Sequence, residues 1–152
     1  MSTATVARAT REAAFRSAAE LREVLGRLLA IVDADERVGP MLRAAHVRTR
    51  FEFPDRRLGL NLASADGEAH CVEWSFGRPA DWEPKVTLRM DSGVANSWLQ
   101  GNESLAIAIA RGRVRCKGET KSTLFFVPVA RLLCDPYKRL IDEEYSHLEI
   151  EN

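Results

Sequence analysis

The feature that most constrains the fold of this chain is a change in the spacing of its apolar residues. Between residues 14 and 32, apolar side chains recur every three or four positions, which is the spacing of one face of a helix. From Val47 to Phe53 they occupy every second position, which is typical of a strand with one buried face. The chain therefore joins an amphipathic helix to strands that have one apolar side and one polar side.

Alternation of this kind predicts five strands. The alternating runs cover residues 47–53, 58–63, 70–76, 85–90 and 113–117. Short turns at Pro54-Asp55 and at Ala65-Asp66-Gly67 separate the first three runs, and this arrangement predicts an antiparallel meander. We expect a mostly antiparallel sheet.

The remaining segments indicate helices. They cover residues 11–32, 35–45, 91–100, 105–110, 120–133 and 135–148. Asp91 is expected to cap the third of these, and Asn102 or Ser104 the fourth. The run 105–110 also alternates like a strand, but its alanines favour a helix. Because helices with one apolar stripe pack on a sheet with one apolar face, the predicted fold is a two-layer α/β (α+β) sandwich.

The length of 152 residues suits one domain, since a chain of this size buries about 68–70% of its unfolded surface without a disulfide or a structural metal. We expect a flexible tail over 1–10 and a single domain over 11–152. Within that domain, 11–45 is an N-terminal helical extension, 47–134 is the core, and 135–148 is a C-terminal helix.

Charge and hydropathy argue against several classes of protein. The 22 basic and 22 acidic residues cancel, whereas a nucleic-acid-binding domain is usually basic. The longest uncharged apolar run, 104–110, is far shorter than the roughly 20 residues that cross a bilayer. We therefore expect no nucleic-acid partner, no transmembrane segment, and, in the absence of a leader-like start, a cytoplasmic location.

Motifs for catalysis or cofactor binding are absent from the sequence. It contains no HExxH or GxSxG motif and no phosphate-binding loop, and its cysteines, Cys71, Cys116 and Cys134, lack the spacing of a metal site. We therefore expect reduced thiols and no catalytic residue, metal or cofactor. The basic run between Arg111 and Lys121 indicates a solvated sheet face, with Glu52 and Glu73 as cross-strand counter-charges.

Bulky apolar residues gather where the sheet is expected to meet the helices, and they either fill a core or line a cavity. The pattern alone does not separate these alternatives, because interiors of this size usually close-pack. The candidates for a cavity lining are Phe51, Trp74, Leu88, Met90, Trp98, Leu105, Ile109, Phe125 and Leu132.

From Val47 to Leu133, the order of elements resembles the sterol carrier protein 2 (SCP-2) domain. The most specific segment is Gly112-Arg-Val-Arg-Cys-Lys-Gly118, which is similar to the glycine-bounded fifth strand of that family. It follows a strand ending at Met90, the segment Trp98-Leu99-Gln100-Gly101 and a small apolar stretch, as in the family.

The resemblance implies a five-stranded sheet with helices on one face and an apolar tunnel that holds sterols, fatty acids, fatty acyl-CoA or phospholipid. The expected function is therefore non-enzymatic binding or transfer of a lipid or another apolar small molecule, with the nine candidates above as the lining. The C-terminal residues 148–152 do not form a peroxisomal address.

Two alternatives remain open at this point. An enzyme or accessory subunit would use the same cavity for a hydrophobic substrate, with His70 and Glu73 as the nearest titratable candidates. An interaction module would form a homodimer through the N-terminal helix and bind no small ligand.

Overall fold

The structure of the chain is a computed structural model that describes residues 14–150; the tail predicted over 1–10 lies outside them. The helices are α2 (Ala18–Ala34), α3 (Val38–Ala44), α4 (Ser92–Leu99), α5 (Leu105–Ala110), α6 (Thr120–Ala130) and α7 (Cys134–Glu144). The strands are β1 (Arg48–Phe53), β2 (Leu58–Ser64), β3 (Val72–Phe76), β4 (Val86–Arg89) and β5 (Arg115–Gly118). Short 3-10 turns cover 54–56, 131–133 and 146–148.

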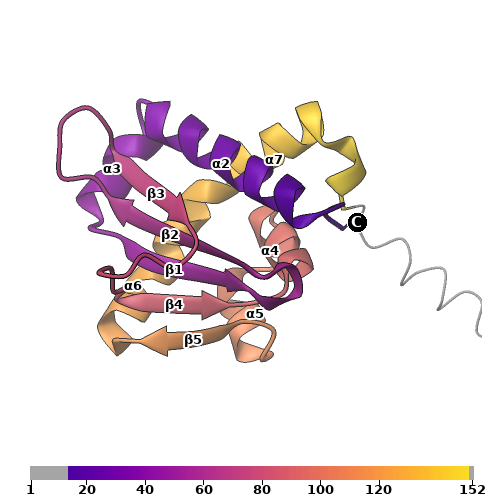
Figure 1. Ribbon diagram of the computed structural model, residues 1–152. Coiled ribbons are helices and arrows are strands. Elements are labelled where there is room, and N and C mark those ends of the chain that lie inside the picture. The colour runs from indigo at the N-terminus through magenta and orange to yellow at the C-terminus, as the bar shows by residue number, and fades with distance from the viewer. Residues whose placement is uncertain (1–13, 151–152) are drawn as a thin grey trace, which may run out of the picture.

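The five strands form one mixed sheet in the order β3-β2-β1-β4-β5. Neighbouring strands are antiparallel except β1 and β4, which are parallel. The predicted meander and the mostly antiparallel sheet are therefore confirmed. Figure 1 shows α2 and α7 across the β3 end of the sheet, and α5 and α6 behind its β4–β5 end.

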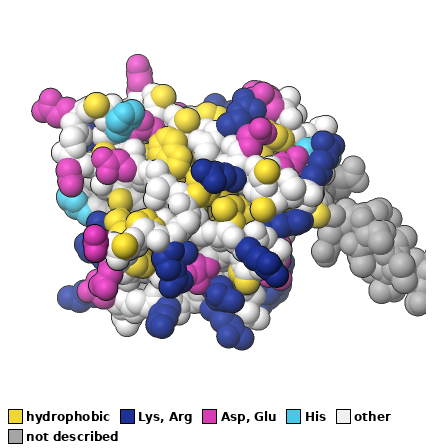
Figure 2. Space-filling view, viewed as in Figure 1, with side chains coloured by type: hydrophobic (Ala, Val, Ile, Leu, Met, Phe, Trp, Pro, Cys, Tyr) yellow, Lys and Arg dark blue, Asp and Glu magenta, His cyan; other side chains and the backbone are white. Residues whose placement is uncertain are grey.

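Strand register places the alternating apolar residues on one face. Phe51 lies opposite Leu60 on β2 and opposite Leu88 on β4, so these side chains share the side that the helices cover. Within the described residues no helix covers the other side of the sheet, which we call its open face; it carries polar residues such as Arg50 and Asn61. Figure 2 shows Lys and Arg side chains gathered over the β4–β5 end of this open face.

Helix α2 begins at Ala18, later than the predicted start near residue 11. The hydroxyl of Ser17 accepts a hydrogen bond from the Glu20 N–H at 3.1 Å, and the Glu20 carboxylate accepts one from the Arg16 N–H at 2.8 Å. The first bond satisfies a donor that the first helical turn leaves free, and the second ties the residue before the cap to the same turn. The side chains that α2 buries on the core are Leu21, Val24, Leu25, Leu28, Leu29 and Val32.

Long-range polar contacts fasten the ends of several elements. The Asp33 carboxylate accepts from the N–H groups of Cys71 and Val72 at 2.6 and 3.0 Å, which ties the end of α2 to β3. The expected cap of α4 is wrong: Asp91 makes no side-chain capping bond, and Asp55 accepts from the Ser92 N–H at 2.9 Å instead. Ser104 caps α5 as predicted, through the Ile107 N–H.

A buried polar cluster fastens α4 to α7 and to the C-terminal segment. Asn96 Oδ1 accepts from the Tyr137 hydroxyl and from Gln100 Nε2, both at 2.7 Å. Asn96 Nδ2 in turn donates to the Leu148 carbonyl at 3.0 Å. Burial raises the pKa of Tyr137 far above its ordinary value, so this hydroxyl acts as a neutral donor.

The three cysteines are free and half-buried. Burial raises the pKa of the Cys116 and Cys134 thiols, which keeps them in the neutral form. Among residues 14–150, no helix combines the length and the hydropathy needed to cross a bilayer.

Candidate functional site

A pocket of about 330 Å³ opens at the end of the sheet where the parallel strands β1 and β4 begin. One wall is the α3–β1 corner, another is the start of β4, and the third is the first two turns of α6. Its apolar surface comes mainly from Val47, Val86, Phe125 and Phe126. The full lining is Ala45, His46, Val47, Arg48, Thr49, Lys85, Val86, Lys121, Ser122, Phe125 and Phe126.

Two backbone features create this pocket. His46 adopts a φ of +51°, which turns the chain sharply between α3 and β1. Gly118 lies so close to β4 that a Cβ atom on it would sit 2.2 Å from the Lys85 carbonyl oxygen. Only glycine permits this approach, and it brings the start of α6 beside Lys85, whose carbonyl accepts from the Glu119 N–H at 3.2 Å.

The rim of the pocket is basic. It carries His46, Arg48, Lys85 and Lys121, and within the described residues none of these forms an ion pair with a carboxylate. Arg48 is held in place because its Nε donates to the Glu83 carbonyl at 2.7 Å and its guanidinium stacks over the Trp82 ring at 4.8 Å. An apolar pocket with a cationic rim can receive an apolar chain that ends in a carboxylate or a phosphate.

A second space lies in the interior, between α2, α4 and the sheet, where the resemblance places a tunnel. It measures only about 20 Å³, little more than the roughly 10–15 Å³ that a single water requires. The structure therefore does not confirm an open interior cavity. Its wholly apolar lining is Leu25, Leu28, Leu29, Phe51, Phe53, Leu60, Leu62, Ala95, Trp98, Leu99 and Leu133.

An aromatic pair separates the outer pocket from the interior space. Phe126 lines the pocket and Phe51 lines the interior, and their rings meet edge to face with centroids 5.9 Å apart. Phe126 belongs to α6 and Phe51 to β1, so this contact joins α6 to the sheet at the boundary between the two spaces.

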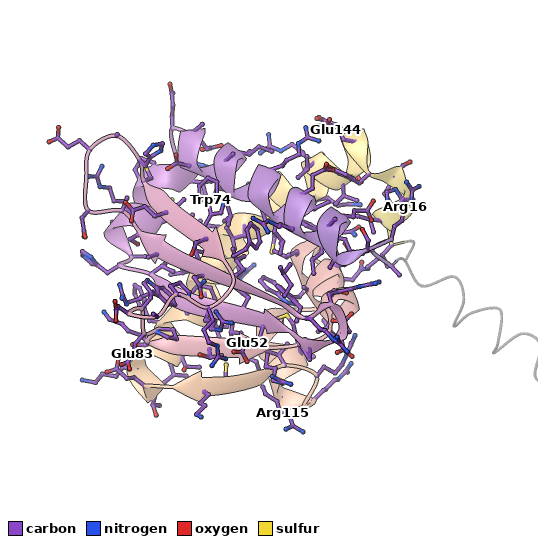
Figure 3. All side chains as sticks on the ribbon, viewed as in Figure 1. Arg16, Glu52, Trp74, Glu83, Arg115 and Glu144 are labelled. Carbon is purple, nitrogen blue, oxygen red and sulfur yellow. The ribbon has the colours of Figure 1, made fainter. Side chains whose placement is uncertain are left out.

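The structure distributes the nine predicted lining residues over several places. Phe125 lines the outer pocket, Phe51 and Trp98 line the interior space, and Trp74 lies in a broad, shallow groove between α2 and β3 (Figure 3). The others fill the core or pack against it: Leu88, Met90, Leu105, Ile109 and Leu132. Their contact with a ligand stays a prediction.

The sequence carries no local signal for the basic rim, because its residues come from three separate segments. The expected pairing of Glu52 and Glu73 with the basic fifth strand is wrong. Glu73 lies on β3, at the opposite edge of the sheet from β5. Glu52 contacts Arg50 at 2.9 Å, Arg78 at 3.1 Å and Arg89 at 3.3 Å instead.

Figure 3 shows Glu52 near the middle of the sheet, away from Arg115 on the edge strand. The hydrogen bond from Arg50, with smaller contributions from Arg89 and Arg78, outweighs burial and lowers the pKa of Glu52. Glu52 therefore stays ionised within its own cluster, and the β5 cations remain without it.

The two titratable candidates for catalysis do not meet in a cavity. His70 is exposed and lies 2.7 Å from the Asp33 carboxylate, and Glu73 is exposed on the open face of the sheet. Neither residue lines the pocket or the interior space. The structure instead places the imidazole of His46 at the pocket.

Comparison with known proteins finds similarity in structure only. No model of a protein family and no curated protein matches the sequence. A UbiJ-SCP2 ubiquinone synthesis protein matches with a TM-score of 0.54 and 18% identity, over 71% of this chain and 85% of that one. Sterol carrier protein 2 from Yarrowia lipolytica, in its apo form, matches with a TM-score of 0.52 and 8% identity, over 82% of this chain and 98% of that one.

A part of a larger enzyme has a similar structure. The sec-alkylsulfatase Pisa1 from Pseudomonas sp. matches with a TM-score of 0.51 and 19% identity, over 66% of this chain but only 15% of the enzyme. At these identities the likeness concerns architecture alone. The chain therefore has an SCP-2-like fold, as the resemblance in its sequence predicts.

Proposed function

We propose that this chain binds a single-chain anionic lipid of the fatty-acid class in the outer pocket and transfers it without chemical change. The observation that carries the proposal is the pairing of an apolar floor with a basic rim. Val86 and Phe126 offer the floor, while Arg48, Lys85 and Lys121 offer cations to an acidic head group.

The size of the pocket supports a slender ligand. Its volume of about 330 Å³ lies at the lower end of the usual range for small-molecule sites, about 300–1,000 Å³. Burial of roughly 400 Å² of ligand surface contributes on the order of 10 kcal/mol. Association and ordering costs reduce this to an affinity in the micromolar range, which permits both uptake and release.

The names of similar structures support the broader class. Sterol carrier protein 2 is named for carrying a sterol, and several neighbours share that name. This favours an apolar ligand here. The choice of an anionic chain over a sterol rests on the rim cations of this chain.

A direct test is extraction of the purified protein with organic solvent, followed by titration with a fatty acid that carries a dansyl group at its tail. We expect co-purified lipid and micromolar binding, with the methyl ester bound about tenfold more weakly because it lacks the carboxylate. Absence of both lipid and titratable binding would contradict the proposal.

A second candidate function is an enzyme or accessory subunit that holds an apolar substrate. The specific observation in its favour is the His46 imidazole at the pocket. Incubation with long-chain acyl esters, followed by mass spectrometry, tests this candidate. Product formation that a His46→Gln variant abolishes would favour it over simple transfer.

A further inference from the structure

Helix α6 is apolar on both of its sides, although only one side faces the core. Phe126 and Ala130 are buried against the sheet. On the other side, Leu124 is 69% exposed and Phe125 is 55% exposed, the highest values among the large hydrophobic side chains of the described chain. A helix with apolar residues all around is normally covered on both sides. Within the described residues, the side of α6 that carries Leu124 and Phe125 is left uncovered.

The exposed residues of α6 form one continuous stripe. Lys121, the neighbours Leu124 and Phe125, Pro128, and Arg131 just after the last residue of α6 succeed one another one helical turn apart, and all five are exposed. We call this stripe the outer face of α6. It has a cation at each end and no carboxylate on the stripe itself; the nearest acidic residues in sequence are Glu119, the N-cap of α6, and Asp135, one turn beyond Arg131. Beside the Lys121 end, the pocket rim adds the cations of Arg48 and Lys85, and no carboxylate of the described residues lines the pocket.

We infer that the outer face of α6 docks on a membrane surface that contains anionic lipid. Apolar side chains flanked by Lys and Arg are suited to such a surface, because the side chains enter the acyl boundary while the cations meet phosphate and carboxylate head groups. A second copy of the chain fits less well. A two-fold pairing of this stripe would bring Lys121 toward the Arg131 of a second copy, and the stripe itself carries no carboxylate to pair with either cation.

The outer face of α6 is continuous with the pocket. Lys121 and Phe125 belong to both. Helix α6 lies beside the start of β4 (Figure 1), where it forms one wall of the pocket. Docking would therefore bring the pocket mouth to the lipid surface, and a chain could enter the pocket without crossing water. This last step rests on the proposed function, whereas the docking itself does not.

The test is co-sedimentation of the full chain with vesicles made of equal parts phosphatidylcholine and phosphatidylserine, compared with pure phosphatidylcholine. We expect binding to the anionic vesicles only. Leu124→Ser should weaken it about tenfold, the effect of withholding one leucine side chain from an apolar phase. Arg131→Glu should weaken it at least fivefold.

Matched controls change the same residue types elsewhere. Met41→Ser removes an apolar side chain of α3 that is 49% exposed, and Arg16→Glu makes the same charge change at the start of α2. Both should bind vesicles like the parent. Failure of the parent to bind anionic vesicles, or equal binding by Leu124→Ser and the parent, would overturn the inference.

Two further measurements keep the inference distinct from the proposed function. Leu124 and Arg131 do not line the pocket, so their variants should bind the dansyl fatty acid in solution like the parent. Loss of vesicle binding with unchanged fatty-acid binding supports docking. Vesicle binding by a parent that takes up no fatty acid would overturn the proposed function alone. A dimer in light scattering that Leu124→Ser dissociates, without vesicle binding, would assign the face to a second copy and overturn the docking.

Discussion

The two halves of one apolar sheet face are covered in different ways. Over the end of β1 and over β2, helices α2 and α4 pack closely and leave an interior space of about 20 Å³. Over the start of β1 and β4, the shorter α6 leaves a pocket of about 330 Å³ and exposes Leu124 and Phe125. The same alternating strand pattern supports both halves, so the covering helix decides whether the surface is closed or open.

The two halves also differ in the hydrogen bonds that hold their helices to the rest of the fold. At the closed half, Asp33, Asp55 and Asn96 each accept hydrogen bonds from other elements. Across the described residues, the side chains of α6 make one hydrogen bond, from Ser122 to the adjacent Glu119. The open half is therefore held mainly by Phe126 and Ala130, and we expect it to move more easily.

The largest expected difference between the halves is in the free energy of unfolding that is lost when a phenylalanine is truncated to alanine. Phe53 is 1% exposed at the closed half, so Phe53→Ala should lower the free energy of unfolding by about 3–5 kcal/mol. Phe125→Ala should change it by less than about 0.5 kcal/mol. Urea unfolding measures both, and equal losses would show that the halves do not differ as described.

The next effect concerns the buried polar cluster. Asn96→Ala leaves the Tyr137 hydroxyl without its acceptor and should cost about 1–3 kcal/mol. Tyr137→Phe removes the donor and leaves Asn96 paired with Gln100, so it should cost less. Thermal unfolding and amide exchange in α7 would check this order. A larger loss in Tyr137→Phe would contradict it.

A smaller effect is expected on ligand binding at the open half. Phe125→Ala removes part of the apolar wall, and it should weaken binding of the dansyl fatty acid about tenfold. Met41→Ala, on α3, is the matched control because Met41 is also exposed but lies outside the pocket lining. Equal affinities for the two variants would exclude Phe125 from the site.

The smallest expected effect is the pH dependence of the stability that Glu52 contributes on the open face of the sheet. Arg50 lowers the pKa of Glu52 below its ordinary value of 4.5. The contribution of Glu52 to stability is therefore complete above about pH 4.5 and is lost as the pH falls through the lower, folded-state pKa. We expect less than about 1 kcal/mol, because the cluster is partly solvated. Urea unfolding of Glu52→Gln should show a weaker acid dependence than the parent; identical curves would contradict the assignment.

Most of the fold could be predicted from the sequence, because alternation and capping are local signals. The strand predicted over 70–76 is β3 (Val72–Phe76), and the ambiguous run 105–110 is helix α5. The fifth strand begins at Arg115 instead of Arg113, since the N–H groups of Arg113 and Val114 bond back to the Ala108 carbonyl at the end of α5. Such boundary shifts arise from contacts between neighbouring elements.

The site was much harder to predict. Alternation indicates which side of a strand is apolar, but it does not indicate how closely a helix approaches that side. Lys85 and Lys121 are far apart in the sequence, and they meet only because Gly118 allows β5 to turn tightly against β4. Phe125 was predicted as a lining residue from its size, and it lines the outer pocket instead of an interior cavity.

The central claim is that the ligand lies in the outer pocket at the α6 end of the sheet. The most direct test is a crystal structure of the chain with a fatty acid brominated at its terminal carbon, in which anomalous scattering locates the bromine. We predict a peak between Val86 and Phe125, with the carboxylate near Lys85 or Lys121. A peak among Leu25, Leu99 and Leu133 in the interior would contradict the account.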